Sequence, residues 1–251
     1  MQGYDRAMKL DILTDDITKG AGSYRILLDG ARVGSLWWNG RGSFSLELFG
    51  CACELRQPDA LERAQQLGQG SRMLLVEGFL SGTISTQREK DGLLSSCTFY
   101  ALRVGDTVAA GYPNPGGGRG WRMSIHRDGA QIALVKRASE PVHTPDECMV
   151  FALDEDAAIQ ALMLACYDVY ASYLDNDGGA AGPFSFRFVN IFGKRAAELD
   201  DPAFEARCAG ELAGEDVAEE ASPESAADRA SRLAAGFAVK GDIVDRHKRS
   251  R

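Results

Sequence analysis

Short runs of β-branched and aromatic residues alternate with polar residues from Ser23 to about Leu153. Alternation of this kind, broken by turn dipeptides, is typical of antiparallel β-strands. The dipeptide Asp-Gly, which occurs here three times, favours the two-residue type I′ turn of a β-hairpin. Three hairpins are therefore predicted, with their turns at Asp29-Gly30, Asp91-Gly92 and Asp128-Gly129: Tyr24–Leu28 with Arg32–Trp38, Gly82–Lys90 with Leu93–Val104, and Trp121–Arg127 with Gln131–Arg137.

The remaining runs predict further strands and one short helix. Trp37 and Trp38 are neighbours on a predicted strand, so their side chains point to opposite faces. We therefore expect one of them in the core and the other, at most, as a single exposed anchor for a membrane interface. The further strands are predicted at Ser43–Arg56, Arg72–Leu80, Thr107–Gly111 and Cys148–Leu153, and the short helix at Pro58–Leu67.

The period of the pattern changes at Asp154, which is a good helix N-cap and is followed by two acidic residues that suit the positive end of a helix dipole. Neither glycine nor proline occurs again until Gly178, which predicts a helix over about 155–174. Its polar residues Gln160 and Asp168 do not form a broad polar face. A helix that is apolar nearly all round must be buried on nearly all sides.

Three segments carry a resemblance to a known group of folds: the opening hairpin at Tyr24–Gly30, the late hairpin at Trp121–Arg137, and the junction Met149–Asp156 that leads into the helix. Strands followed by one enclosed apolar helix resemble the tubby C-terminal-like superfamily, which includes LURP-one-related proteins, phospholipid scramblases and bacterial relatives. The resemblance covers roughly residues 8–176. It implies a mainly β (α+β) fold, in which a closed antiparallel β-barrel encloses one hydrophobic central helix. The alternative is a lipocalin-like barrel, whose helix would pack outside and be amphipathic.

Charge is distributed unevenly along the chain. The formal net charge is -8, but residues 196–230 alone hold eleven acidic and two basic side chains, whereas 231–251 hold six basic and two acidic ones. The acidic total argues against a protein whose main partner is nucleic acid. We therefore predict a nearly neutral barrel domain at 1–176, an aromatic linker at 177–195, and a largely flexible acidic tail at 196–251 with a possible short helix at 223–235.

One stretch of the predicted barrel is locally basic, and it is the candidate ligand-binding site: Arg119, Arg122, Arg127, Lys136 and Arg137. On the first strand of the late hairpin, Arg122 shares a face with Ser124 and His126, whereas the opposite face is apolar and fits the barrel interior. Arginine binds phosphate through its planar fork of donors. Since members of the tubby branch bind phosphoinositide headgroups, the resemblance implies a site for phosphate or a lipid headgroup. The alternative is a solvated strand face, and an acidic tail that folds back would compete for it.

Two other features suggest different classes of protein. Phe184, Phe186 and Phe188 alternate in a strand-like segment, 184–192, which could dock on the barrel or on another subunit of an assembly. His126 and His143 could belong to a small enzyme with its site at a barrel mouth, but no catalytic motif accompanies them.

We expect neither a cofactor nor a metal. Cys51 and Cys53 form a C-x-C pair with no histidine or second pair nearby, and the six cysteines are expected to be free thiols. The N-terminus has no secretory signal, and no apolar run reaches the roughly 20 residues of a bilayer span. The sequence therefore favours a cytoplasmic, non-enzymatic binding or scaffold module, peripheral at the membrane where it recognises phospholipid headgroups, or bound to a protein partner.

Overall fold

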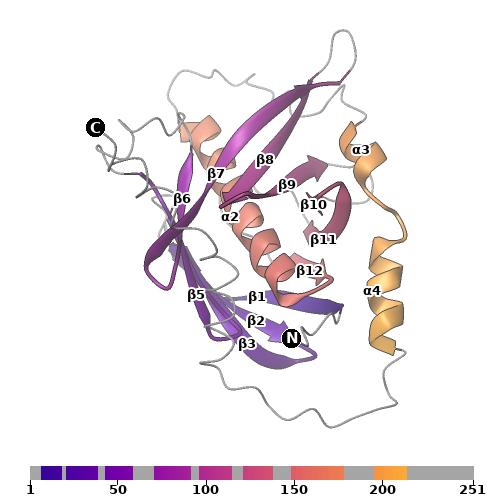
Figure 1. Cartoon of the computed structure of the whole chain (residues 1–251). Coiled ribbons are helices and arrows are strands. Elements are labelled where there is room, and N and C mark those ends of the chain that lie inside the picture. The colour runs from indigo at the N-terminus through magenta and orange to yellow at the C-terminus, as the bar shows by residue number, and fades with distance from the viewer. Residues whose placement is uncertain are drawn as a thin grey trace, which may run out of the picture.

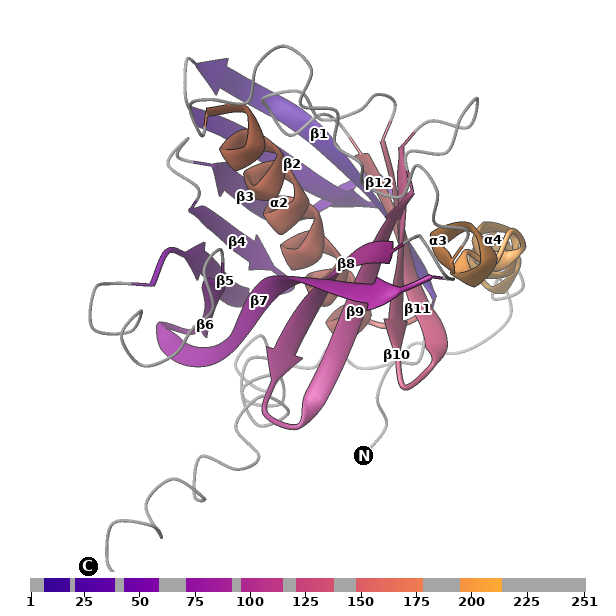
Figure 2. The ribbon, with the colours of Figure 1, turned by 90° about the horizontal axis from the view of Figure 1, so that it is seen from above.

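Twelve antiparallel strands close into a barrel around one central helix, α2 (Glu155–Asp177) (Figures 1 and 2). This architecture, seen in a computed structural model, confirms the predicted fold class. The structure describes residues 7–18, 21–38, 43–58, 71–91, 96–114, 121–137, 148–177 and 195–213. The strands are β1 (Met8–Thr18), β2 (Ala21–Leu28), β3 (Ala31–Trp38), β4 (Phe44–Leu48), β5 (Cys51–Arg56), β6 (Arg72–Val76), β7 (Phe79–Lys90), β8 (Ser96–Val104), β9 (Thr107–Asn114), β10 (Arg122–Arg127), β11 (Ala130–Arg137) and β12 (Cys148–Ala152).

Every strand pairs with its neighbours in the sequence, and β1 pairs with β12 to close the barrel. In such an up-and-down arrangement, successive connections alternate between the two ends of the barrel. The tight turns of the β2–β3, β4–β5, β6–β7, β8–β9 and β10–β11 hairpins therefore lie at one end. Helix α2 follows β12 and starts at this same end, so it enters the barrel beside the tight turns.

Two of the Asp-Gly turns behave as the sequence predicts. Asp29 and Gly30 have φ angles of 51° and 79°, and Asp128 and Gly129 have 52° and 80°. Both residues of each pair therefore take the left-handed conformation of a type I′ turn. These two hairpins are confirmed. The third pair of strands, β7 and β8, also pairs as predicted, but Lys90 lies opposite Ser96, so five residues (91–95) separate the strands and the predicted two-residue turn at Asp91-Gly92 is wrong.

Two other turns correct the strand prediction. Phe49-Gly50 and Glu77-Gly78 also have positive φ angles, so the segment Ser43–Arg56 is not one strand but the hairpin β4–β5. Likewise, Arg72–Leu80 is divided between β6 and the start of β7. Each turn is supported by the neighbouring hairpin, because the Phe49 N–H donates to the Val33 carbonyl at 3.1 Å and the Glu77 N–H donates to the Ala52 carbonyl at 2.9 Å.

The first strand lies outside the region that the pattern marks as strand-like. β1 begins at Met8, well before Ser23, and pairs with both β2 and β12. Its residues Leu10 and Ile12 point into the core and are almost fully buried. The short helix predicted at Pro58–Leu67 lies, except for its first residue, outside the described part of the chain.

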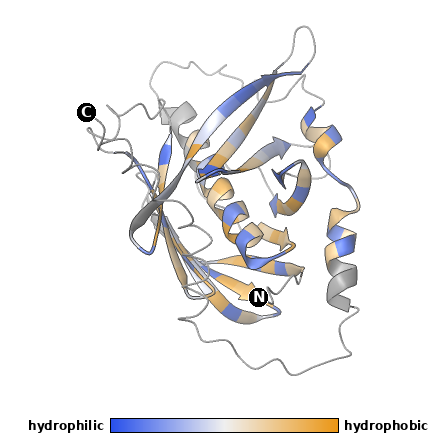
Figure 3. Ribbon diagram, in the orientation of Figure 1, coloured by the Kyte–Doolittle hydropathy of each residue, from blue (hydrophilic) through white to orange (hydrophobic). Residues whose placement is uncertain are grey.

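Helix α2 is buried on all sides over most of its length. Every residue from Ala157 to Val169 is buried, and the helix is mainly hydrophobic (Figure 3). The Asp154 carboxylate accepts a hydrogen bond of 2.6 Å from the Ala157 N–H, which confirms the predicted N-cap. On β9, a Cβ atom at Gly111 would lie 3.0 Å from the Met123 sulfur and in ordinary contact with Leu164 of the helix, at 3.4 Å. An outer amphipathic helix of the lipocalin kind is thereby excluded for α2.

The interior also contains a charged cluster that joins α2 to the barrel wall. Asp168 of α2 and Arg137 of β11 are 1% and 2% exposed, and their Oδ2 and Nη1 atoms lie 3.6 Å apart. Tyr100 donates a hydrogen bond of 2.7 Å to Asp168, and Arg137 donates one of 2.9 Å to the Ala165 carbonyl. The Arg137 guanidinium also lies over the Trp121 ring, 4.3 Å from its centroid. These contacts fix the rotation of the helix inside the barrel.

In the described part of the chain, α3 (Arg195–Leu199) and α4 (Phe204–Ala213) lie outside the barrel (Figures 1 and 2). The sequence predicts a largely flexible acidic tail over nearly all of these residues. In the structure they pack on the outer faces of β9, β11, β12 and β1. Among the described helices, none has both the length and the apolar character needed to cross a bilayer.

Candidate binding site on the outer face of β10 and β11

Arg122 and Lys136 are the two predicted ligand-binding residues that the structure brings together on the barrel exterior. They are directly opposite each other in the register of β10 and β11. Met123 and Ile125 of β10 belong to the interior core, so Arg122, Ser124 and His126 form an outward-facing row on that strand. The predicted division of this strand into an apolar inner face and a polar outer face is therefore correct.

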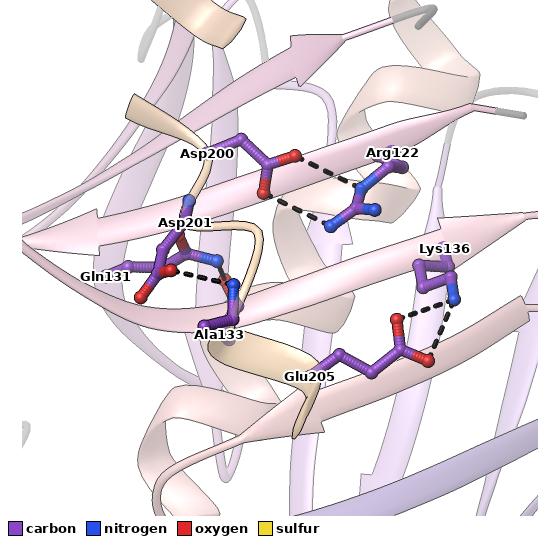
Figure 4. A network of polar contacts seen from close by, with 8 residues as sticks. Arg122, Gln131, Ala133, Lys136, Asp200, Asp201 and Glu205 are labelled. Atoms are coloured by element: carbon purple, nitrogen blue, oxygen red, sulfur yellow. Dashed lines mark hydrogen bonds and ion pairs between the residues drawn. The ribbon is translucent and has the colours of Figure 1, made fainter. Parts of the chain in front are cut away.

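Both cations are held by carboxylates from the segment that follows the barrel (Figure 4). Arg122 makes a two-point contact with Asp200, with Nε 3.2 Å from Oδ2 and Nη2 3.3 Å from Oδ1. The Lys136 ammonium lies 2.7 and 2.9 Å from the two carboxylate oxygens of Glu205. The sequence leaves open whether the acidic segment folds back on the basic strands, and in the structure Asp200 and Glu205 contact Arg122 and Lys136.

The two ion pairs differ in burial. The Arg122 and Asp200 side chains are 10% and 11% exposed, whereas Lys136 and Glu205 are 23% and 37% exposed. A partly buried, two-point arginine–carboxylate contact is stronger than an exposed lysine pair, because solvent screens it less and its geometry is fixed. Arg122–Asp200 is therefore the principal polar contact between this face and the outer helices.

Two polar side chains on the same outer row are buried without hydrogen-bond partners among the described residues. They are Ser124, through its Oγ, and His126, through both ring nitrogens. Burial holds the pKa of His126 below its ordinary value, since a charged imidazole would lose its hydration there. The edge of the Tyr112 ring meets the His126 ring at a centroid distance of 5.6 Å. Ser124 and His126 are therefore shielded from solvent although these polar atoms lack hydrogen-bond partners, which is unusual for buried polar groups.

The other basic residues of the predicted site lie elsewhere. Arg127 faces the inside at the tight-turn end, where it pairs with Asp154 at 3.6 Å. Arg137 is inside the barrel with Asp168 and is not part of the outer face. Arg119 lies outside the described residues, as do the predicted partner-binding residues Phe184, Phe186 and Phe188.

A small cavity at the tight-turn mouth of the barrel is the place where an enzyme site would be expected. Its volume is about 90 Å³, and its lining includes Arg127, Asp156 and Gln160 besides apolar side chains of β8 and β9. His126 does not line it, and His143 lies outside the described residues. In the described part of the chain, His, Cys, Asp and Glu side chains form no group of three suited to a metal ion.

The acidic partners Asp200 and Glu205 are the residues of this site that sequence reasoning does not identify individually. The only signal is the excess of acidic residues after position 196, which names no particular contact. No protein-family model, curated protein or solved structure matches this chain.

Proposed function

We propose that this protein is a non-enzymatic binding module whose outer β10–β11 face binds the phosphate of an anionic phospholipid headgroup. The observation that carries the proposal is the position of Arg122 and Lys136, side by side on neighbouring strands and each in contact with a carboxylate. Carboxylate and phosphate oxygens fit the same fork of arginine donors. A phosphomonoester is the stronger ligand of the two, because its charge at pH 7 is about -1.5 to -2.

The unsatisfied row on β10 supports the same ligand chemistry. Alternate residues of a strand lie about 6.6 Å apart, so a headgroup placed over Ser124 can reach towards both Arg122 and His126. The Ser124 hydroxyl and a His126 ring N–H are donors, and phosphate oxygens are acceptors. Leaving a buried polar group without a partner costs about 1–3 kcal/mol, so a ligand that pairs with these groups gains that amount relative to the covered state.

The resemblance to the tubby C-terminal-like superfamily supports the choice of a phospholipid. A closed barrel around a hydrophobic helix is the architecture that the resemblance implies, and the tubby branch binds phosphoinositide headgroups.

Trp37 does not belong to the proposed face. It is 43% exposed on β3, which is five strands away from β10 around the barrel.

Co-sedimentation of the full chain with vesicles tests this function. We expect binding to phosphatidylcholine vesicles that contain phosphatidylinositol phosphate, weaker binding when phosphatidylserine supplies the same charge, and loss of binding as salt is raised. Arg122→Gln and Lys136→Gln should each weaken binding about fivefold, because one basic residue near an anionic surface contributes about 1 kcal/mol.

Arg103→Gln is the matched control, since Arg103 is an exposed arginine on the outside of β8. Equal losses for Arg103→Gln and Arg122→Gln would mean that binding depends only on net charge and would refute the site. Binding to a phosphoserine peptide without binding to phosphoinositide vesicles would refute the lipid and favour a protein partner.

A further inference from the structure

The connection between α3 and α4 crosses the proposed binding face. α3 packs on β9, whereas α4 packs on β11, β12 and β1. Because β10 lies between β9 and β11, the connecting residues 200–203 must pass over its outer surface. Within this connection, the Asp201 N–H donates a hydrogen bond of 2.9 Å to the Gln131 side chain, opposite His126 (Figure 4). The connection therefore lies over the outer row of β10, Arg122, Ser124 and His126, which a headgroup would contact.

Helix α4, which follows the connection, is firmly anchored to the barrel. Phe204 and Cys208 are completely buried, and they share an apolar cluster with Leu134 and Phe151 on the outside of β11 and β12. A buried phenylalanine removes a large apolar area from water, and displacing it would expose both the ring and the surface below. Release of α4 is therefore the more costly movement.

The half of this segment that precedes α4, namely α3 and residues 200–203, is held much less strongly. α3 has five residues; its buried side chain Ala196 packs with Cys97 and Tyr112, and Leu199 packs against the same cluster while only partly buried. Arg195 pairs with Glu89 at 2.7 Å, but these side chains are 48% and 32% exposed, so solvent screens the pair. So short a helix has little stability of its own. The Arg195 N–H also donates to the Asp91 carboxylate at 3.1 Å, and the Asp201 N–H donates to Gln131. The Arg122–Asp200 contact is the most buried ion pair of this half and thus its main electrostatic attachment.

The packing of α3 and residues 200–203 on the barrel also carries an energetic cost. Ser124 and His126 are buried under the connection without hydrogen-bond partners among the described residues. Water could satisfy these groups if α3 and the connection moved away, and a phosphate could satisfy them better. Docking is therefore favoured by few apolar contacts and opposed by unpaired polar atoms.

We propose that α3 and residues 200–203 form a gate over the phosphate site, with α4 as its fixed anchor. Asp200 occupies the Arg122 fork when the gate is closed, and the headgroup phosphate takes that place when it opens. Docking of α3 and binding of the headgroup exclude each other, so the protein's own segment sets the apparent affinity of the site. This regulation rests on the proposed phosphate-binding function.

Neutralising Asp200, which competes with the headgroup phosphate for Arg122, tests the gate. Asp200→Asn should tighten binding of the full chain to phosphoinositide-containing phosphatidylcholine vesicles about tenfold, since the substitution removes the ion pair with Arg122 and weakens the hydrogen bond from Arg122 Nη2, which hold the gate closed. Glu198→Gln is the matched control, because Glu198 is an exposed acid on the adjacent helix α3 and its neutralisation changes net charge equally. This control should change the affinity less than about twofold at physiological salt. Ala196→Gln, which is too large for the buried site of Ala196, should tighten binding by an independent route.

The outcomes separate the two proposals. Tighter binding by both Asp200→Asn and Ala196→Gln, with Glu198→Gln near the wild type, is the expected result. Wild-type binding that neither Asp200→Asn nor Ala196→Gln improves would overturn the gate and leave the phosphate site standing. Failure of the wild type and all variants to bind phosphoinositide vesicles would overturn the proposed function and the regulation with it.

Discussion

Replacement of Asp168 by asparagine should destabilise the barrel by removing one charge of a buried pair. Asp168 is 1% exposed and lies 3.6 Å from the Arg137 guanidinium, which is 2% exposed. Asparagine has nearly the same shape and can still accept the hydrogen bond from Tyr100. The substitution therefore leaves the packing of α2 almost unchanged and removes chiefly the electrostatic partner of Arg137.

The size of the effect follows from the geometry. Two unit charges at 3.6 Å attract by about 4–5 kcal/mol at an effective dielectric constant near 20. Breaking a buried pair by removing one partner typically costs about 3–5 kcal/mol, because the other charge stays buried. Arg137 keeps its hydrogen bond to the Ala165 carbonyl and its stacking on Trp121. We therefore expect Asp168→Asn to lower the free energy of unfolding by about 3 kcal/mol.

Equilibrium unfolding in urea measures this change. Asp11→Asn is the control, because the Lys9 and Asp11 side chains are 39% and 36% exposed and their pair should contribute less than about 1 kcal/mol. Replacing both buried charges with apolar residues, Arg137→Met with Asp168→Leu, should recover much of the stability. A decrease below about 1 kcal/mol for Asp168→Asn would refute the view that this pair holds the helix in place.

Two further predictions concern single positions. In the folded protein the pKa of His126 lies below its ordinary value, so as the pH falls the unfolded chain binds a proton first and the free energy of unfolding decreases. Unfolding measured between about pH 7.5 and 5 should show a smaller decrease in this free energy for His126→Phe than for the wild type, and an equal decrease would contradict the reasoning. Gly34→Ala should destabilise by about 1–3 kcal/mol, because its Cβ would clash with the Glu47 carbonyl oxygen on the neighbouring strand. Normal stability in a thermal melt would contradict this close strand contact.

The fold is largely predictable from the sequence because its main signals are local. Asp-Gly marks two confirmed turns, and Asp154 together with the apolar run after it marks the enclosed helix. Phe49-Gly50 and Glu77-Gly78 adopt the same left-handed geometry without an Asp-Gly signal. Their conformation depends on hydrogen bonds that the Phe49 and Glu77 N–H groups donate to carbonyls of neighbouring hairpins, which single-sequence reasoning does not see.

The candidate site is less predictable because closeness in sequence is not closeness in space. Strand alternation turns Arg127 and Arg137 inward, away from the outer face that Arg122 and Lys136 share. The acidic partners come from a distant segment whose docking depends on the burial of Phe204. Composition reveals the negative charge of that segment but not which carboxylate meets which cation.

The most direct test of the gated phosphate site is hydrogen exchange in the full chain, with and without phosphoinositide-containing vesicles. The Asp201 N–H, bonded to Gln131, reports on the gate, and the backbone N–H of the buried Cys208, inside α4, reports on the anchor. We expect vesicle binding to increase exchange at Asp201 and to leave Cys208 protected. Continued or increased protection of Asp201 in the bound protein would contradict the gate.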